Sequence, residues 1–166
     1  SFESTERVLP SYVIESLRQH HYTFSIVGKK ALDHFSQDIS AEHTVSGIHD
    51  LDNRRIVVSD TSAVVVLHEI GHFVSCSFQK VKGENLTQTK EWREIYNSEK
   101  SKYVSKTDFE RVKDVYAATS PNEFFAECFQ QYYLAQNTLA KNCPKAYSFI
   151  QRTMTKDFPQ ISGTLW

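Results

Sequence analysis

The sequence predicts an α+β fold in which a small N-terminal sheet packs on a mainly helical C-terminal half, with a cleft between the two. Two observations lead to this prediction. Before Ser59, short apolar runs have the spacing of strands and turns, whereas after Ser59 apolar residues recur at helical spacing. The 166 residues match the usual size of one domain. We therefore expect a single domain over residues 1–166, with an N-terminal subdomain over about 1–60 and a helical one over about 61–166.

The elements of the N-terminal part follow from local periodicity. We expect helices at residues 11–20 and 29–35, and strands at residues 22–27, 44–48 and 55–58. The last two strands flank a turn-rich segment and are consistent with a hairpin. An extended substrate could pair with an edge strand of this sheet, for which the strand at 55–58 is the candidate.

The helical part begins with a long apolar helix. Capping side chains at Asp60, Thr61 and Ser62 place its start near Ser62, and Gly83 places its end before that residue. Further helices are expected at residues 91–100, 109–116, 121–136 and 144–155.

Composition excludes several classes of partner. Nineteen basic and 20 acidic residues give a formal charge of −1, and no long basic stripe occurs, which argues against nucleic acid. No apolar run has the length that spans a membrane, so no membrane partner is expected. Nothing in the sequence calls for a second subunit, and we expect a monomer.

The segment His68-Glu69-Ile70-Gly71-His72 carries the strongest chemical signal. In a helix, residues four apart project from one face, so both imidazoles can reach a single Zn²⁺ ion, and Glu69 lies on the adjacent side as a candidate base. The flanking residues are apolar nearly all round the helix, which predicts burial. Buried polar groups need partners, and a zinc ion would supply them.

A catalytic zinc site usually takes three protein ligands. Most downstream acidic residues lie among Lys and Arg and are expected on solvated helix faces; these are Glu91, Glu94, Glu99, Glu110 and Asp114. Glu123 and Glu127 differ, because they stand four residues apart in an aromatic stretch where like charges repel unless a cation lies near. We assign Glu123 as the third ligand and Glu127 as the acceptor for a ligand imidazole, although spacing alone also allows the reverse.

These motifs resemble a known family. The segment from Val64 to Phe78, and the segment from Tyr116 through Glu123-Phe124-Phe125-Ala126-Glu127 to Arg152, resemble the catalytic domain of anthrax lethal factor and above all the secreted Pro-Pro endopeptidases. The resemblance implies a zincin-like fold with zinc held by His68, His72 and Glu123, Glu69 as base, and Tyr116 stabilising the oxyanion. It also implies a secreted bacterial protein.

The resemblance ends upstream of the motif. The Pro-Pro endopeptidases carry a Gly-rich, Trp-bearing substrate loop there, whereas residues 36–60 contain one glycine, Gly47, and no Trp. The sequence therefore leaves Pro-directed cleavage open. His43 and His49 could line the cleft, but without ligand spacing they are expected to be exposed turn residues, and His20, His21 and His34 are expected at the surface.

The expected function is zinc-dependent hydrolysis of peptide bonds in polypeptide substrates. Two alternatives stay open. One is the protease domain of a toxin that acts on a specific host protein, and the other is a zinc-binding interaction module without turnover. The presence of both Glu69 and Tyr116 argues against the module.

Overall fold

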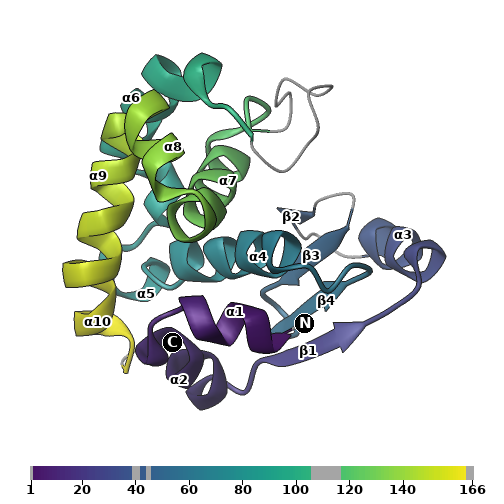
Figure 1. The fold of residues 1–166 in the computed structure, drawn as a ribbon. Helices are drawn as coiled ribbons and strands as arrows, with labels where there is room; N and C mark the ends of the chain where they lie inside the picture. The colour runs from purple at the N-terminus through teal and green to yellow at the C-terminus, as the bar shows by residue number, and fades with distance from the viewer. Residues whose placement is uncertain (1, 39–41, 44–45, 106–116, 164–166) are drawn as a thin grey trace.

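The computed structural model describes residues 2–38, 42–43, 46–105 and 117–163 and has the predicted α+β fold. Figure 1 shows a small sheet on one side, helix α4 (Ala63–Cys76) beside it, and the C-terminal helices on the other side of α4. The expected helix at 109–116 lies outside the described residues.

The sheet has the strand order β1-β4-β3-β2 among the described residues. Its strands are β1 (Thr23–Ile26), β2 (Glu42–His43), β3 (Gly47–Asp50) and β4 (Arg55–Val58). The predicted hairpin is confirmed, because β3 and β4 pair antiparallel, but β3 runs to Asp50 rather than ending at residue 48, so His49 and Asp50 lie in the strand and not in the turn. The prediction that β4 is an edge strand is wrong, because β4 pairs with β3 on one side and, in parallel, with β1 on the other.

The helical elements agree with most of the predicted ranges. Besides α4 they are α1 (Phe2–Val8), α2 (Ser11–Gln19), α3 (Lys29–Asp38), α5 (Gln79–Lys82), α6 (Lys90–Glu99), α7 (Pro121–Leu134), α8 (Gln136–Asn142), α9 (Pro144–Arg152) and α10 (Phe158–Ile161). Short 3₁₀ turns occur at Leu86–Gln88 and Lys100–Lys102, and a π turn at Thr153–Asp157 joins α9 to α10. The long helix expected before Gly83 is divided into α4 and α5, and Gly83 ends α5 with a φ of 75°.

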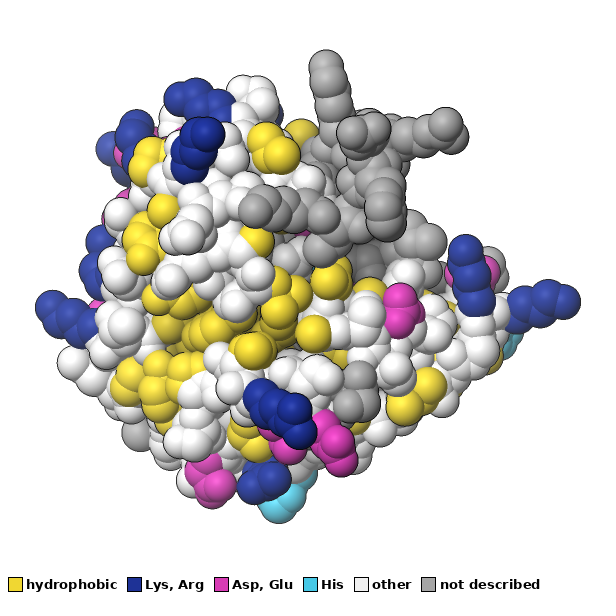
Figure 2. All heavy atoms as spheres, viewed as in Figure 1, with side chains coloured by type: hydrophobic (Ala, Val, Ile, Leu, Met, Phe, Trp, Pro, Cys, Tyr) yellow, Lys and Arg dark blue, Asp and Glu magenta, His cyan; other side chains and the backbone are white. Residues whose placement is uncertain are grey.

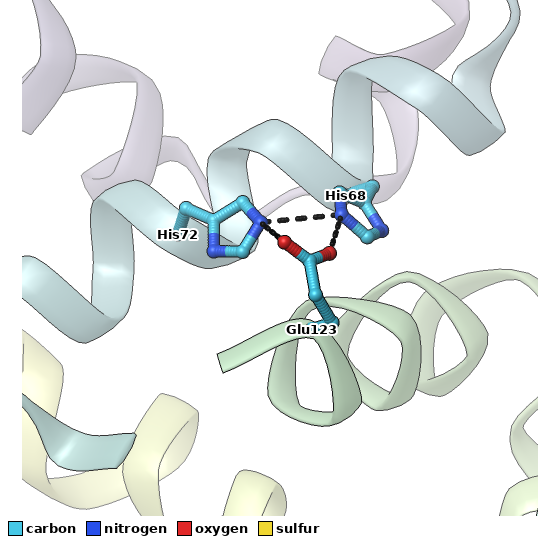
Figure 3. A group of neighbouring side chains, drawn as sticks. All are labelled: His68, His72 and Glu123. Carbon is cyan, nitrogen blue, oxygen red and sulfur yellow. Dashed lines mark hydrogen bonds and ion pairs between the residues drawn. The ribbon is translucent and has the colours of Figure 1, made fainter. Parts of the chain in front are cut away.

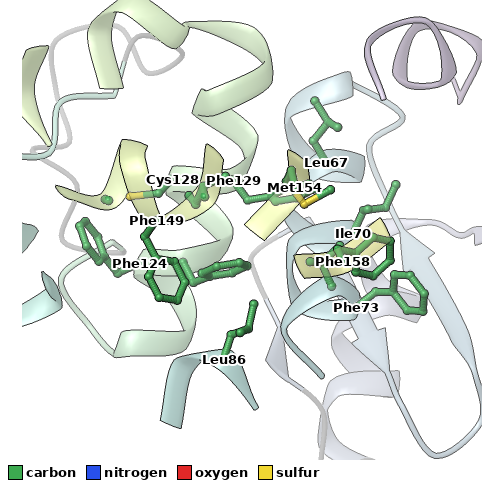
Figure 4. Packing of buried hydrophobic residues seen from close by; sticks show 14 of the residues in the cluster. Leu67, Ile70, Phe73, Leu86, Phe124, Cys128, Phe129, Phe149, Met154 and Phe158 are labelled. Carbon is green, nitrogen blue, oxygen red and sulfur yellow. The ribbon is translucent and has the colours of Figure 1, made fainter. Parts of the chain in front are cut away.

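Helix α4 lies at the centre of the hydrophobic core. Its side chains Leu67, Ile70 and Phe73 are fully buried. Figure 4 shows Ile70 and Phe73 next to Phe158 of α10, with Phe129 of α7 and Phe149 of α9 in the same cluster. An aromatic core of this kind fixes the position of α4, because burying each large side chain contributes about 1.5–3 kcal/mol.

Glu99 corrects an expectation from the charge pattern. Its side chain is buried rather than solvated, with 2 % of its surface exposed. Its two carboxylate oxygens accept hydrogen bonds of 2.9 Å from the backbone N–H groups of Lys145 and Ala146. These groups belong to the first turn of α9, where a carboxylate is favoured by the helix dipole. Glu99 therefore joins the end of α6 to the start of α9.

Charges of both signs lie around the margin of the face shown in Figure 2, and hydrophobic side chains gather towards its middle. None of the helices in the described ranges combines the length and the apolar character needed to cross a membrane.

Candidate metal centre

Helix α4 presents two imidazole rings side by side. His68 and His72 are one turn apart, and 2 % and 1 % of their surfaces are exposed. Their ring centroids lie 4.9 Å apart with an interplanar angle of 75°, and their Nε2 atoms are 3.2 Å apart. The helical spacing therefore brings both nitrogens to one point in the interior, as the sequence predicts.

Helix α7 brings a carboxylate to the same point. Pro121 occupies the first turn, and the Ser120 hydroxyl accepts a hydrogen bond of 3.1 Å from the Glu123 N–H, which caps the helix. Glu123 is buried, and its oxygens lie 3.0 Å from His68 Nε2 and 3.6 Å from His72 Nε2. Figure 3 shows the Glu123 side chain rising from α7 between the two rings.

Gly71 allows α4 and α7 to approach closely enough for these contacts. A Cβ atom at Gly71 would lie 3.1 Å from the Ala126 Cα and 3.1 Å from the Phe129 Cβ, both on α7. Real Cβ atoms rarely have contacts this short, so any side chain at this position would push the two helices apart. Glycine thus sets the distance between the imidazoles and Glu123.

The three donor groups fit a zinc ion. A tetrahedral zinc ion with bonds of about 2.0–2.1 Å places its ligand atoms about 3.3 Å from one another. With one donor atom from each residue, the donor atoms of His68, His72 and Glu123 all lie within 4.8 Å of one another. The two Nε2 atoms are 3.2 Å apart, Glu123 Oε2 is 3.0 Å from His68 Nε2, and Glu123 Oε1 is 3.6 Å from His72 Nε2. Two imidazoles and one carboxylate also form a donor set that zinc accepts.

Glu127 lies one turn beyond Glu123 and contacts the other nitrogen of His68. Its Oε1 atom is 2.8 Å from His68 Nδ1. Each nitrogen of His68 therefore faces a different carboxylate: Nε2 faces Glu123 and Nδ1 faces Glu127. A hydrogen bond to Nδ1 fixes the orientation and tautomer of a ligand imidazole.

The Glu69 carboxylate is fully buried and packs against a strand. A Cβ atom at Gly47, in β3, would lie only 2.6 Å from Glu69 Oε1 and 2.9 Å from Glu69 Cγ. The carboxylate therefore occupies the space that a side chain at position 47 would fill. Gly47 is the single glycine that the sequence has between residues 36 and 60.

Comparison with known proteins places the chain in a family. The profile of the family described as "Anthrax toxin lethal factor, N- and C-terminal domain" matches residues 28–153, which is more than half of the chain. The chain belongs to this family. Among solved structures, the Pro-Pro endopeptidase PPEP-2 from Paenibacillus alvei has the same fold, with a TM-score of 0.57 and 16 % identity over 90 % of this chain and 89 % of that chain. No curated protein matches the sequence.

Five of the six predicted site residues of this lethal factor family member lie within the described residues, and Tyr116 lies outside them. The structure brings His68, His72, Glu123 and Glu127 into one contact group. Glu69 is buried on the same helix as the two histidines.

Burial and hydrogen bonding act in opposite directions on the acid–base groups of this centre. Burial lowers the pKa of His68, but hydrogen bonds with Glu123 and Glu127 outweigh it and raise the pKa to about 9. Burial raises the pKa of Glu123, but hydrogen bonds with His68 and His72 prevail and lower it to about 2. At neutral pH, without metal, His68 is therefore protonated and Glu123 is ionised.

His49 lies behind His72 and, together with Tyr22, forms a second buried layer at this centre. The prediction that His49 is exposed is wrong. Only 3 % of its surface is exposed, and the other residues of β3 are buried as well. Its ring is parallel to that of His72 within 17° at 6.5 Å, and its Nε2 atom lies 2.8 Å from the Tyr22 hydroxyl. Burial, followed by the nearby His72, lowers the pKa of His49 to about 3, so His49 is neutral.

Tyr22 completes this layer. Burial raises the pKa of Tyr22, so its hydroxyl keeps its proton, and it shares a hydrogen bond of 2.8 Å with His49 Nε2. The two rings are stacked with centroids 5.7 Å apart, and Tyr22 also packs edge-on against Phe73. No spacing within the sequence links residues 22, 49 and 72, so sequence reasoning missed this layer. His20 is also buried, contrary to expectation, and the His43 side chain lies outside the described residues.

Substitution of Gly47 by Ala tests how Glu69 is positioned. The three atoms nearest to the new Cβ belong to Glu69 and Val65, so the Glu69 carboxylate must move. Metal affinity should be kept, while turnover in a reaction that uses Glu69 as the base should fall by roughly 10–100-fold. Gly28→Ala is the control, because a Cβ there meets nothing within 4 Å. Equal kcat values for the two variants would contradict the positioning of Glu69 by Gly47.

Zinc uptake should release a proton. Zinc binds neutral imidazole, whereas His68 is protonated in metal-free protein up to its pKa of about 9. Zinc affinity should therefore rise about tenfold per pH unit between pH 7 and 9, with about one proton released per zinc. Calorimetric titrations in buffers of different ionisation enthalpy measure this release. An affinity independent of pH over this range would contradict the raised pKa of His68.

Proposed function

We propose that this chain is a zinc-dependent endopeptidase that hydrolyses peptide bonds in polypeptide substrates. The convergence of His68, His72 and Glu123 on one buried point carries the proposal. Membership of the lethal factor family and a fold shared with an endopeptidase support it. We further propose that the protein is monomeric, consists of one catalytic domain, and is secreted by a bacterium.

In this proposal His68, His72 and Glu123 are the zinc ligands and Glu127 holds His68. The distances favour this assignment over its reverse, because Glu123 contacts the nitrogens of both rings whereas Glu127 contacts Nδ1 of one ring. A bound zinc ion would lower the pKa of a water molecule towards neutrality and polarise the scissile carbonyl group.

The chain's own residues then move the protons. Glu69 accepts the proton of the attacking water and passes it to the leaving amine. Its carboxylate suits this role because it is buried and follows directly after the ligand His68 on the same helix. The resemblance assigns Tyr116 as the donor to the developing oxyanion. The sequence analysis named the strand at 55–58 as the one that an extended substrate would pair with. This strand is β4, an inner strand, so the substrate has to pair with another part of the chain. Pro-directed cleavage and action on one host protein remain finer proposals for a cleavage profile to decide.

Zinc content and the Glu69 variant test the proposal together. The purified protein should hold about one zinc ion and lose peptidase activity with a chelator. Glu69→Gln should keep the zinc ion and lower turnover by roughly 10²–10⁴-fold, because the base is lost while the ligands remain. Glu94→Gln, on an exposed helix face, is the control and should retain activity. Full activity in metal-free protein would refute the zinc mechanism, and full activity of Glu69→Gln would refute the role of Glu69.

The two carboxylates of α7 are separated by zinc titration. Glu123→Ala should reduce zinc affinity severely, because a ligand is removed. Glu127→Ala should weaken it by the smaller factor, roughly 10–100-fold, that outer partners of ligand histidines contribute. If Glu127→Ala had the larger effect, the two roles would have to be exchanged.

The role of Tyr116 is tested by removing its hydroxyl. Tyr116→Phe should preserve the fold and the zinc ion while lowering kcat by roughly 10²–10³-fold, as for other oxyanion donors. KM should change little, because the interaction forms mainly in the transition state. Steady-state kinetics with near-normal kcat would instead show that Tyr116 has a packing role.

A further inference from the structure

Tyr103 lies beside the candidate metal centre, although no motif includes it. Its side chain is buried, and its ring packs edge-on against Phe124 with centroids 6.2 Å apart. Its hydroxyl is 3.2 Å from the Glu127 carboxylate oxygen Oε2 and 3.2 Å from the Glu127 backbone carbonyl. The phenol therefore contacts both the side chain and the backbone of one residue.

The same carboxylate continues to the metal ligands. Glu127 Oε1 lies 2.8 Å from His68 Nδ1, and His68 Nε2 belongs to the donor group. Tyr103, Glu127 and His68 thus form a continuous hydrogen-bonded series that ends at the proposed zinc ion. We propose that Tyr103 is a positioning residue of the metal centre, which holds the Glu127 carboxylate so that Glu127 can orient His68. This inference rests on the metal centre of the proposed function.

The physical basis is the freedom of the Glu127 side chain. About 15 % of this side chain is exposed, so its carboxylate can turn towards water if one oxygen loses its partner. The single phenol hydrogen is shared between the carboxylate and the carbonyl of the same residue, which holds the side chain against its own helix. A carboxylate held in this way loses less conformational freedom when it bonds to His68, which favours metal binding.

Tyr103 is itself held firmly on both sides. Before it, Glu99 anchors the end of α6 to the first turn of α9. After it, the Gln131 side chain of α7 donates a hydrogen bond of 2.7 Å to the Val104 carbonyl. These anchors fix the backbone around residue 103, so the position of the phenol does not depend on its own contacts alone.

Tyr103→Phe tests the proposal, and Tyr96→Phe is a matched control. Both residues are buried, both rings pack against Phe124, and both hydroxyls donate to a backbone carbonyl, which for Tyr96 is that of Ala118. The difference is that the Tyr103 hydroxyl also lies against the Glu127 carboxylate, whereas the hydrogen bond of the Tyr96 hydroxyl goes to Ala118. Zinc affinity is measured on the full metal-free chain by competition with a chromophoric chelator, together with thermal unfolding with and without zinc.

Tyr103→Phe should weaken zinc binding about tenfold, at the lower end of the effect of removing an outer partner of a ligand. Tyr96→Phe should leave the affinity unchanged. Both variants should lower the Tm of metal-free protein by similar amounts, whereas the rise in Tm on adding zinc should shrink for Tyr103→Phe alone. In a Glu127→Ala background, Tyr103→Phe should cause no further loss of affinity, because the side chain through which it acts is gone.

Equal zinc affinities for the two Tyr variants would overturn the proposal and show that the Tyr103 hydroxyl only supports the fold. A further loss in the Glu127→Ala background would also overturn it, because Tyr103 would then act independently of the Glu127 side chain. If the unmodified chain bound no zinc, the proposed function would fail as well. Normal zinc binding with indistinguishable Tyr variants would remove only the role of Tyr103.

Discussion

The close crossing of α4 and α7 is the constraint on which the candidate metal centre depends. The histidines come from α4 and the two carboxylates from α7, so their donor atoms meet only at one distance between the helices. Gly71 sets that distance, because its α-carbon faces Ala126 and Phe129 without a side chain between them. Within the motif, the histidines supply donor atoms, and Gly71 sets the helix spacing that lets these atoms meet the carboxylates of α7.

The electrostatics of the centre favour a cation. Glu69, Glu123 and Glu127 approach two imidazoles in a largely buried space, where isolated charges are unfavourable. Without metal, a proton on His68 partly balances the carboxylates, which is why the pKa of His68 is raised to about 9. A divalent ion would replace that proton and add charge where the carboxylates converge. The same contacts thus account for the raised pKa and for the fit to zinc.

Local periodicity accounts for what could be predicted from the sequence. The spacing of His68 and His72, and that of Glu123 and Glu127, needs only the repeat of an α-helix, which holds whatever surrounds it. The hairpin of β3 and β4 was likewise predicted, because its turn lies between two short apolar runs. The like-charge pair, and then the family resemblance, linked the two helices, since no rule of spacing connects residues 72 and 123.

Long-range packing determines what the sequence could not show. Glu99 stands among Lys and Arg residues, yet its carboxylate meets the N-terminus of a helix that begins 45 residues later in the chain, at Pro144. His49 begins the segment that looked turn-rich, yet it lies in β3, which has a strand on each side and is in contact with α4. In each case the burial of a polar side chain depends on a partner distant in sequence. Tyr103 belongs to this class, because its role comes from its contact with Glu127, which lies 24 residues later in the chain.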